Sequence, residues 1–201
     1  LADGYISRIR VTNGSGYVLD VCYHNGYSTI NRHLSAFLSP IAERVKKLQY
    51  ENENWEIEII PEPDEYPVKA GQRIALSGNT GYSFGPHLHL DVFETETGDY
   101  IDPMPFFKKN LKDTRAPKAD GIMLFPQLGK GVVSGSQENK TILPNSEHPV
   151  EAWGVIGTGI KAYDYMDGVN NHYGVYSVVL TVDGAEVFRS TVDRFSQEEN
   201  R

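Results

Sequence analysis

Two dipeptides, Asn25-Gly26 and Asp183-Gly184, restrict the fold more than any other feature of the sequence. Each is a preferred centre of a type I′ turn, in which both central residues need a positive φ. Each also separates two segments of strand-like alternation, 17–23 and 27–33 around the first and 176–182 and 185–190 around the second. This pattern is typical of β-hairpins. We therefore expect antiparallel strand pairs in both halves of the chain and an all-β fold.

Further alternating segments extend this prediction along the chain. Strands are expected at 5–11, 55–59, 73–77, 87–93, 122–125, 150–155 and 160–165. In the first of them, the alternation puts Tyr5, Ser7, Ile9 and Val11 on one face. A single helix is expected after Ser39-Pro40, with Ser39 as its cap and Ile41, Val45 and Leu48 at helical spacing.

A polar stretch at 113–117 that ends in a proline predicts a domain boundary. The length of 201 residues allows one or two domains. We expect an antiparallel β-sheet domain at 1–112, followed by a small β-sandwich domain at 117–201, because short strands with frequent Gly and Pro are typical of sandwiches.

Composition excludes several classes of protein. Lys and Arg number 19 against 27 Asp and Glu, and the net charge of −8 argues against binding to nucleic acid or to an anionic membrane surface. No apolar run approaches the roughly 18 residues needed to span a bilayer. Cys22 is the one cysteine, which excludes an internal disulfide framework and a Cys-rich zinc cluster. The oligomeric state is left open.

The strand expected at 87–93 carries the residues with chemical potential. Residues two apart on a strand share a face, so His87, His89 and Asp91 lie together while Leu88, Leu90 and Val92 point into a core. Neutral imidazole is a good zinc ligand, and a nearby carboxylate can orient the ring. With 6 histidines in 201 residues, chance alone gives roughly 0.18 His-x-His pairs. The pair by itself therefore favours surface histidines or a hydrogen-bonded strand histidine over a metal site.

A longer stretch resembles the lysostaphin-like (LytM-type) zinc metallopeptidases, which cut peptidoglycan cross-links. Gly85-Pro86-His87-Leu88-His89-Leu90 is similar to the family's Gly-Pro-His-x-His signature, and segment 68–81 resembles the sequence that leads into it. Segment 25–34 is similar to a family strand that ends in a functional histidine, here His33. Ala2-Asp3-Gly4 resembles the turn that opens a family strand, and Asp102-Pro103 resembles the exit from the domain.

The resemblance implies a role for each matched residue. His89 would be a zinc ligand, and Asp91 would orient its ring. His87 and His33 would face the substrate, as a general base or as a stabiliser of the oxyanion. The loop before the signature would form one wall of the substrate groove, through the residues Asn79, Tyr82 and Gly85.

The family's other two zinc ligands come from a His-x-x-x-Asp motif upstream of the Asp-Gly turn. No such motif precedes Asp3-Gly4 here, and we expect it just before Leu1. On this expectation, domain 1–112 lacks its N-terminal edge in these 201 residues, and domain 117–201 is incomplete at its C-terminus.

The function that the resemblance implies is a zinc-dependent endopeptidase that hydrolyses peptide cross-links of bacterial peptidoglycan. The expected cofactor is Zn2+, the expected partner is the peptidoglycan peptide, and the expected location is the cell envelope, periplasmic or secreted. An alternative is a catalytically degenerate lysostaphin-like module that binds cell wall or regulates another hydrolase, because the upstream ligand motif is missing from the sequence. A third hypothesis gives residues 117–201 the main role, as an adhesion or docking domain.

Overall fold

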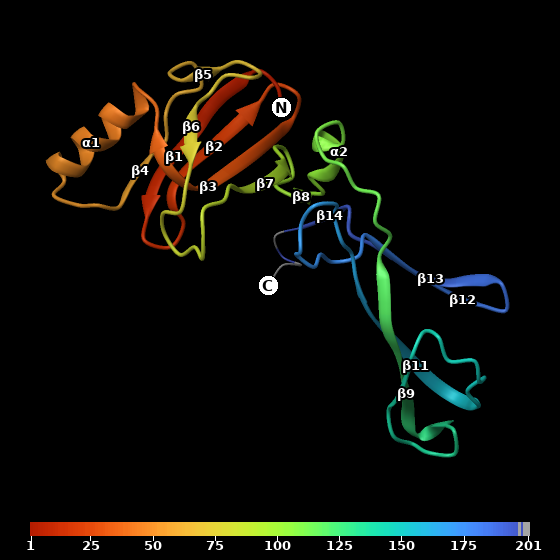
Figure 1. Cartoon of the computed structure of the whole chain (residues 1–201). Coiled ribbons are helices and arrows are strands. Elements are labelled where there is room, and N and C mark those ends of the chain that lie inside the picture. Colours follow the sequence, from red (N-terminus) through yellow and green to blue (C-terminus); the bar gives the residue numbers. More distant parts are fainter. Residues whose placement is uncertain (197, 199–201) are drawn as a thin grey trace. The chain divides into compact units, whose positions relative to one another are not determined.

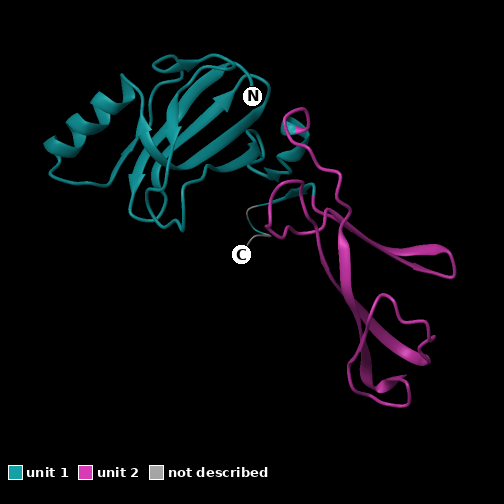
Figure 2. Cartoon of the chain, viewed as in Figure 1, with its two compact units in different colours: residues 1–107, 193–201 teal, residues 108–192 magenta. Residues whose placement is uncertain are grey.

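The computed structural model describes residues 1–196 and 198, and most of its regular structure is antiparallel β-sheet (Figure 1). The expected all-β fold is confirmed. The chain divides into two compact units (Figure 2). Unit 1 contains residues 1–107 and the described residues from 193 onward, and unit 2 contains residues 108–192. The domains expected at 1–112 and 117–201 stay a prediction.

A single sheet organises unit 1. Its strands follow the order β14-β8-β7-β3-β2-β1-β4, with β5 also paired to β1 and β6 to β3 (Figure 1). The strands are β1 (Gly4–Thr12), β2 (Gly16–Tyr23), β3 (Tyr27–Phe37), β4 (Ile57–Ile59), β5 (Pro67–Val68), β6 (Ala75–Ser77), β7 (His89–Glu94), β8 (Tyr100–Ile101) and β14 (Arg194–Phe195). Because β3 lies between β2 and β7, side chains of β3 and β7 can meet on one face.

The core of unit 1 is built on β1 and β2. Their buried residues pack with helix α1 (Ile41–Glu51) and with β3, β4 and β5, in a cluster formed by Ile6, Ile9, Val11, Leu19, Val21, Leu34, Phe37, Ile41, Val45, Ile57, Ile59 and Val68. Strand β1 has an irregularity between Ile6 and Arg8, which shifts its alternation. The common face predicted for Tyr5, Ser7, Ile9 and Val11 is therefore wrong, since Ile6 is buried with Ile9 and Ser7 is not.

The two predicted hairpins form, but their turns differ. Asp183 and Gly184 have φ values of 50° and 81°, as a type I′ turn requires. In the first hairpin only Gly26 has a positive φ, of 86°, and its N–H donates to the carbonyl of Tyr23 at 3.3 Å. The type I′ turn predicted at Asn25-Gly26 is thus wrong. The chain reverses over residues 23–26, and Gly26 is the last residue of this turn, directly before β3.

Helix α1 lies where the proline predicts it, with Ile41 and Val45 buried and Leu48 partly buried. The predicted capping role of Ser39 is wrong, because no side chain caps the helix and the Ser39 hydroxyl instead donates to the Glu43 carboxylate. A second short helix, α2, spans Met104–Phe107. Neither helix in the described part of the chain has the length and apolar character needed to cross a bilayer.

Unit 2 contains two separate small sheets. Strands β9 (Lys118–Val133), β10 (Lys140–Ile142) and β11 (Ala152–Tyr163) form one, and β12 (Ser177–Val182) pairs with β13 (Ala185–Thr191) in the other. The segments predicted as separate strands at 150–155 and 160–165 belong largely to one strand, β11, whose pairing with β9 shifts register between Gly154 and Ile156. The β-sandwich expected for this region stays a prediction.

Candidate metal centre

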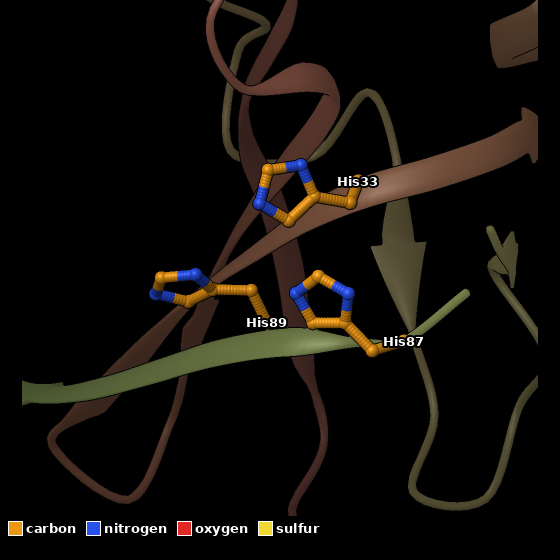
Figure 3. Close-up of side chains that lie close together, drawn as sticks. All are labelled: His33, His87 and His89. Carbon is orange, nitrogen blue, oxygen red and sulfur yellow. The ribbon is translucent and has the colours of Figure 1, made fainter. Parts of the chain in front are cut away.

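Three histidines from two neighbouring strands face one another (Figure 3). His33 belongs to β3, His89 is the first residue of β7, and His87 lies just before β7. The ring centroid of His33 is 4.9 Å from that of His87 and 5.7 Å from that of His89. One nitrogen from each ring lies within 4.8 Å of the other two. Among the described residues, no other group of three His, Cys, Asp or Glu side chains comes as close.

His33 is turned toward this site by an irregular backbone. It is 7% exposed and has a φ of 59°, in the left-handed region that residues other than glycine seldom adopt. The pairing of β2 with β3 shifts register here, because Tyr17 is opposite Leu34 whereas Leu19 is opposite Asn31. Bulges of this kind redirect a side chain, and strained backbone concentrates at functional sites.

A carbonyl group selects the tautomer of His33. Nδ1 of His33 is 2.9 Å from the carbonyl oxygen of Thr80. Because a carbonyl can only accept, Nδ1 must carry the proton in the neutral ring, and Nε2 keeps its lone pair. The backbone N–H of His33 also donates to the carbonyl of Ser15 at 3.1 Å.

A backbone carbonyl also fixes the tautomer of His87, although this side chain is exposed. Its Nδ1 is 2.8 Å from the carbonyl oxygen of Gly85 and 3.2 Å from the hydroxyl of Ser83. The bond to the carbonyl again places the proton on Nδ1 and leaves Nε2 free to accept. Its backbone N–H donates to the carbonyl of Gly78 at 2.9 Å, so the loop before the strand fixes both ends of the residue.

His89 is bonded through its other nitrogen. Nε2 lies 3.2 Å from Oδ1 of Asp91, and the side chains of His89 and Asp91 are 43% and 17% exposed. The guanidinium of Arg32 lies 2.7 Å from the other oxygen of Asp91, so the carboxylate is placed between a cation and the imidazole. With Nε2 engaged by the carboxylate, Nδ1 is the nitrogen left for a ligand.

The role of Asn79, Tyr82 and Gly85 in a substrate groove stays a prediction, and the structure places all three on the loop before His87. Asn79 and Tyr82 are exposed on the loop before His87, with Tyr82 76% exposed. Gly85 contributes its carbonyl to His87, and a Cβ added to it would meet no atom within 4 Å. The prediction that Leu88 points into the core is wrong, because it is 48% exposed. The ladder with β3 ends at the pair of Arg32 and His89, so Leu88 lies beyond the paired part of the strand.

The sequence pattern did not single out Thr80 or Ser83, although both bond to the site's histidines. Phe84 was missed as well. It is 96% exposed, and its ring contacts that of Tyr82 at a centroid distance of 5.4 Å. The signal available in the sequence was their position, since all three lie between Gly78 and Gly85, just before the histidine pair.

The donor set fits zinc. Imidazole binds zinc at about 2.0–2.1 Å, which puts two nitrogens on a tetrahedral ion about 3.4 Å apart. One nitrogen from each ring lies within 4.8 Å of the other two here, a looser grouping than three ligands of one ion, so one ring can hold an ion while the other two lie beside it. Neutral imidazoles with a carboxylate behind one of them are typical of zinc sites.

Sequence comparisons give metalloprotease relatives. The chain is 33% identical over 91 residues to an uncharacterized metalloprotease of Haemophilus influenzae and 29% identical over 119 residues to one of Buchnera aphidicola. Over 45 residues it is 53% identical to lysostaphin of Staphylococcus simulans. The resemblance to lysostaphin-like metallopeptidases is confirmed.

These likenesses cover parts of each protein. The three matches span 45%, 56% and 20% of this chain, but only 14%, 25% and 9% of the respective relatives. No family model matches the chain. The solved structure of lysostaphin from Staphylococcus simulans aligns with 84% of this chain and 70% of its own, at 20% identity and a TM-score of 0.32.

Proposed function

We propose that this lysostaphin-like chain is the catalytic part of a zinc-dependent endopeptidase that hydrolyses peptide cross-links of bacterial peptidoglycan in the cell envelope. The observation that carries the proposal is the group of three imidazoles, two of which have Nε2 free to accept a proton. Named relatives support it, because lysostaphin and a glycyl-glycine endopeptidase of Staphylococcus capitis are each 53% identical to the chain over 45 residues.

In this proposal His89 holds the metal through Nδ1. The Asp91 carboxylate orients the ring from behind, and Arg32 keeps that carboxylate in place. The resemblance places the remaining ligands in a His-x-x-x-Asp motif that does not precede Asp3-Gly4 within these 201 residues. When bound, zinc would polarise the scissile carbonyl and lower the pKa of a water molecule to about 7.

His33 and His87 would handle the protons and the developing charge. Each presents Nε2 with its lone pair, because a backbone carbonyl holds the proton on Nδ1. His87 is exposed and would take the proton from the attacking water and return it to the leaving amine. His33 is buried and fixed, and after taking up a proton from solvent on Nε2 it would carry N–H groups on both nitrogens, with Nδ1 donating to the Thr80 carbonyl and Nε2 donating to the oxyanion.

The loop of residues 78–86 would form one wall of the substrate groove. Asn79 and Tyr82 are exposed there, and Gly85 has open space beside its Cα. An extended peptide without bulky side chains could approach such a wall closely. The glycine-rich substrate implied by the name of the Staphylococcus capitis relative would suit this groove.

The test uses the full-length protein and purified peptidoglycan. We expect His89→Ala to lose both bound zinc and activity. We expect His87→Ala to keep the zinc and to lose about 10²–10⁴-fold in rate, because it removes only proton transfer. His148→Ala, in a loop of unit 2, is the matched control and should behave as wild type.

The outcomes separate the alternatives. Equal digestion by wild type and His89→Ala would refute the proposal. Zinc loss in His87→Ala and His33→Ala as well would mean that all three imidazoles are ligands. Peptidoglycan binding by the wild type without hydrolysis or bound zinc would favour the degenerate binding module.

A further inference from the structure

We propose that Thr80 is the positioning residue that holds His33 in its working orientation and tautomer, an inference that rests on the proposed function. Its backbone carbonyl accepts the Nδ1 proton of His33 at 2.9 Å. That bond keeps Nε2 of His33 available on the side where His87 and His89 lie. The position of this one carbonyl therefore decides which nitrogen of His33 faces the site.

The hydroxyl of Thr80 fixes where that carbonyl lies. It donates to the carbonyl of Leu34 in β3 at 2.6 Å and accepts from the N–H of Tyr17 in β2 at 3.0 Å. Tyr17 and Leu34 face each other at the register shift where His33 leaves the regular ladder. The threonine hydroxyl thus bridges two strands at the place where their own pairing is irregular, and it satisfies a donor and an acceptor there.

Two glycines allow the loop to come this close. Gly16 and Gly81 have φ values of 69° and 74°. A Cβ on Gly16 would lie 2.2 Å from the Thr80 hydroxyl, and one on Gly81 would lie 2.3 Å from the backbone nitrogen of Gly16. The N–H of Tyr82 donates to the carbonyl of Gly14 at 2.7 Å. The loop is therefore seated directly on the turn between β1 and β2, and Thr80 is fixed within it.

The same loop also reaches His87. The carbonyl of Gly78 accepts the backbone N–H of His87 at 2.9 Å, and the carbonyl of Gly85 accepts its Nδ1 proton at 2.8 Å. Thr80 lies between these two glycines and bonds to His33. A displacement of Thr80 would therefore change the distance between His33 and His87, as well as the orientation of His33 itself.

The experiment compares Thr80→Val with Thr80→Ser in the full-length protein. Valine keeps the shape and removes the hydroxyl, whereas serine keeps the hydroxyl. We expect Thr80→Val to lower kcat about 10- to 100-fold with little change in KM, as is typical for partners that orient a site residue from outside. Thr80→Ser should retain kcat within about threefold, since its hydroxyl can make the same two bonds.

A second readout does not depend on activity. Nitrogen-15 NMR of the histidine rings at alkaline pH distinguishes the Nδ1–H from the Nε2–H tautomer. We expect His33 to be the Nδ1–H form in wild type and Thr80→Ser, and to become a mixture in Thr80→Val. An unchanged tautomer together with an unchanged kcat in Thr80→Val would overturn the inference.

If Thr80→Val fails to fold, the wild-type spectrum decides. A scalar coupling between His33 Nδ1 and a labelled Thr80 carbonyl supports the inference, and an Nε2–H form of His33 overturns it. A wild-type protein that shows the expected tautomer but digests no peptidoglycan would refute the proposed function while leaving the placement of His33 by Thr80 intact.

Discussion

Units 1 and 2 carry similar alternating strand patterns but bury them differently. In unit 1, Ile9, Leu19 and Val21 are completely buried. In the described part of unit 2, Val133 is the one hydrophobic residue in the buried core. Trp153 and Phe188, by contrast, are 68% and 54% exposed. Alternation therefore predicts strands in both units, but whether a face becomes a core depends on what covers it.

The cover in unit 1 comes from segments distant in the sequence. Helix α1 and strands β4 and β5 contribute residues to the cluster built on β1 and β2. His33 lies on β3 beside Leu34, which belongs to this cluster, and His89 begins the neighbouring strand β7, so the site is built on strands that adjoin a rigid core. Three predictions test this contrast.

The largest difference is expected from removing a leucine side chain in each unit. Leu19 is fully buried, so Leu19→Ala should lower the free energy of unfolding by about 3–4 kcal/mol, through lost burial and a residual cavity. Leu128 in unit 2 is 82% exposed, and Leu128→Ala should change it by less than about 0.5 kcal/mol. Amide hydrogen exchange in β2 and β9 measures the two effects separately. Similar decreases in the free energy of unfolding for the two variants would contradict the proposed difference in burial between the units.

A smaller difference is expected from two glycines of positive φ. Gly16 and Gly135 have φ values of 69° and 78°, so alanine at either site costs about 1 kcal/mol of backbone strain. An alanine Cβ at position 16 would also approach the Thr80 backbone to 2.5 Å, whereas one at position 135 would meet no atom within 4 Å. Gly16→Ala should therefore cost about 2–3 kcal/mol in all. Urea unfolding of both variants gives the comparison, and equal midpoints would contradict the tight seating of the loop.

The smallest effects concern two ion pairs whose dependence on pH has opposite sign. Burial raises the pKa of Asp20 above its usual 3.8, although the guanidinium of Arg10 opposes this. As the pH rises, Asp20 therefore loses its proton in the unfolded chain before it does so in the folded protein. The contribution of Asp20 to the free energy of unfolding is lost as the pH rises from about 3.8 through the folded pKa. In unit 2, the hydrogen bond from Arg189 lowers the pKa of Glu186 below 4.5, and its effect is lost as the pH falls through the folded pKa.

Replacing each carboxylate by its amide removes the titration. Relative to Asp20→Asn, wild type should lose stability as the pH rises through that window, and relative to Glu186→Gln it should gain stability as the pH rises toward 4.5. Denaturant unfolding from pH 2.5 to 7 measures both slopes. A positive slope at Asp20 would show that Arg10 outweighs burial.

Short-range patterns in the sequence predicted the longer strands and the grouping of the site, but not the short strands β5, β8, β10 and β14 or the contacts that support the site. The spacing of His87 and His89 and the position of His33 depend on local alternation and on the resemblance, and the structure brings all three together. The irregularity after Ile6 and the left-handed backbone of His33 depend on pairing between strands, which a local pattern does not contain. The contribution of Thr80 likewise needs two strands and a loop to meet.

After unit 2, the chain returns to the sheet of unit 1 at strand β14. Arg194 and Phe195 pair with Ile101 and Tyr100, and the rings of Phe195 and Tyr100 stack at a centroid distance of 5.1 Å. Arg194 also lies 2.6 Å from the carboxylate of Glu94. Residues 108–192 are thus a closed excursion that leaves one sheet and returns to it. A single cut inside this excursion would therefore leave each fragment with strands of the same sheet, β1 to β8 in one and β14 in the other.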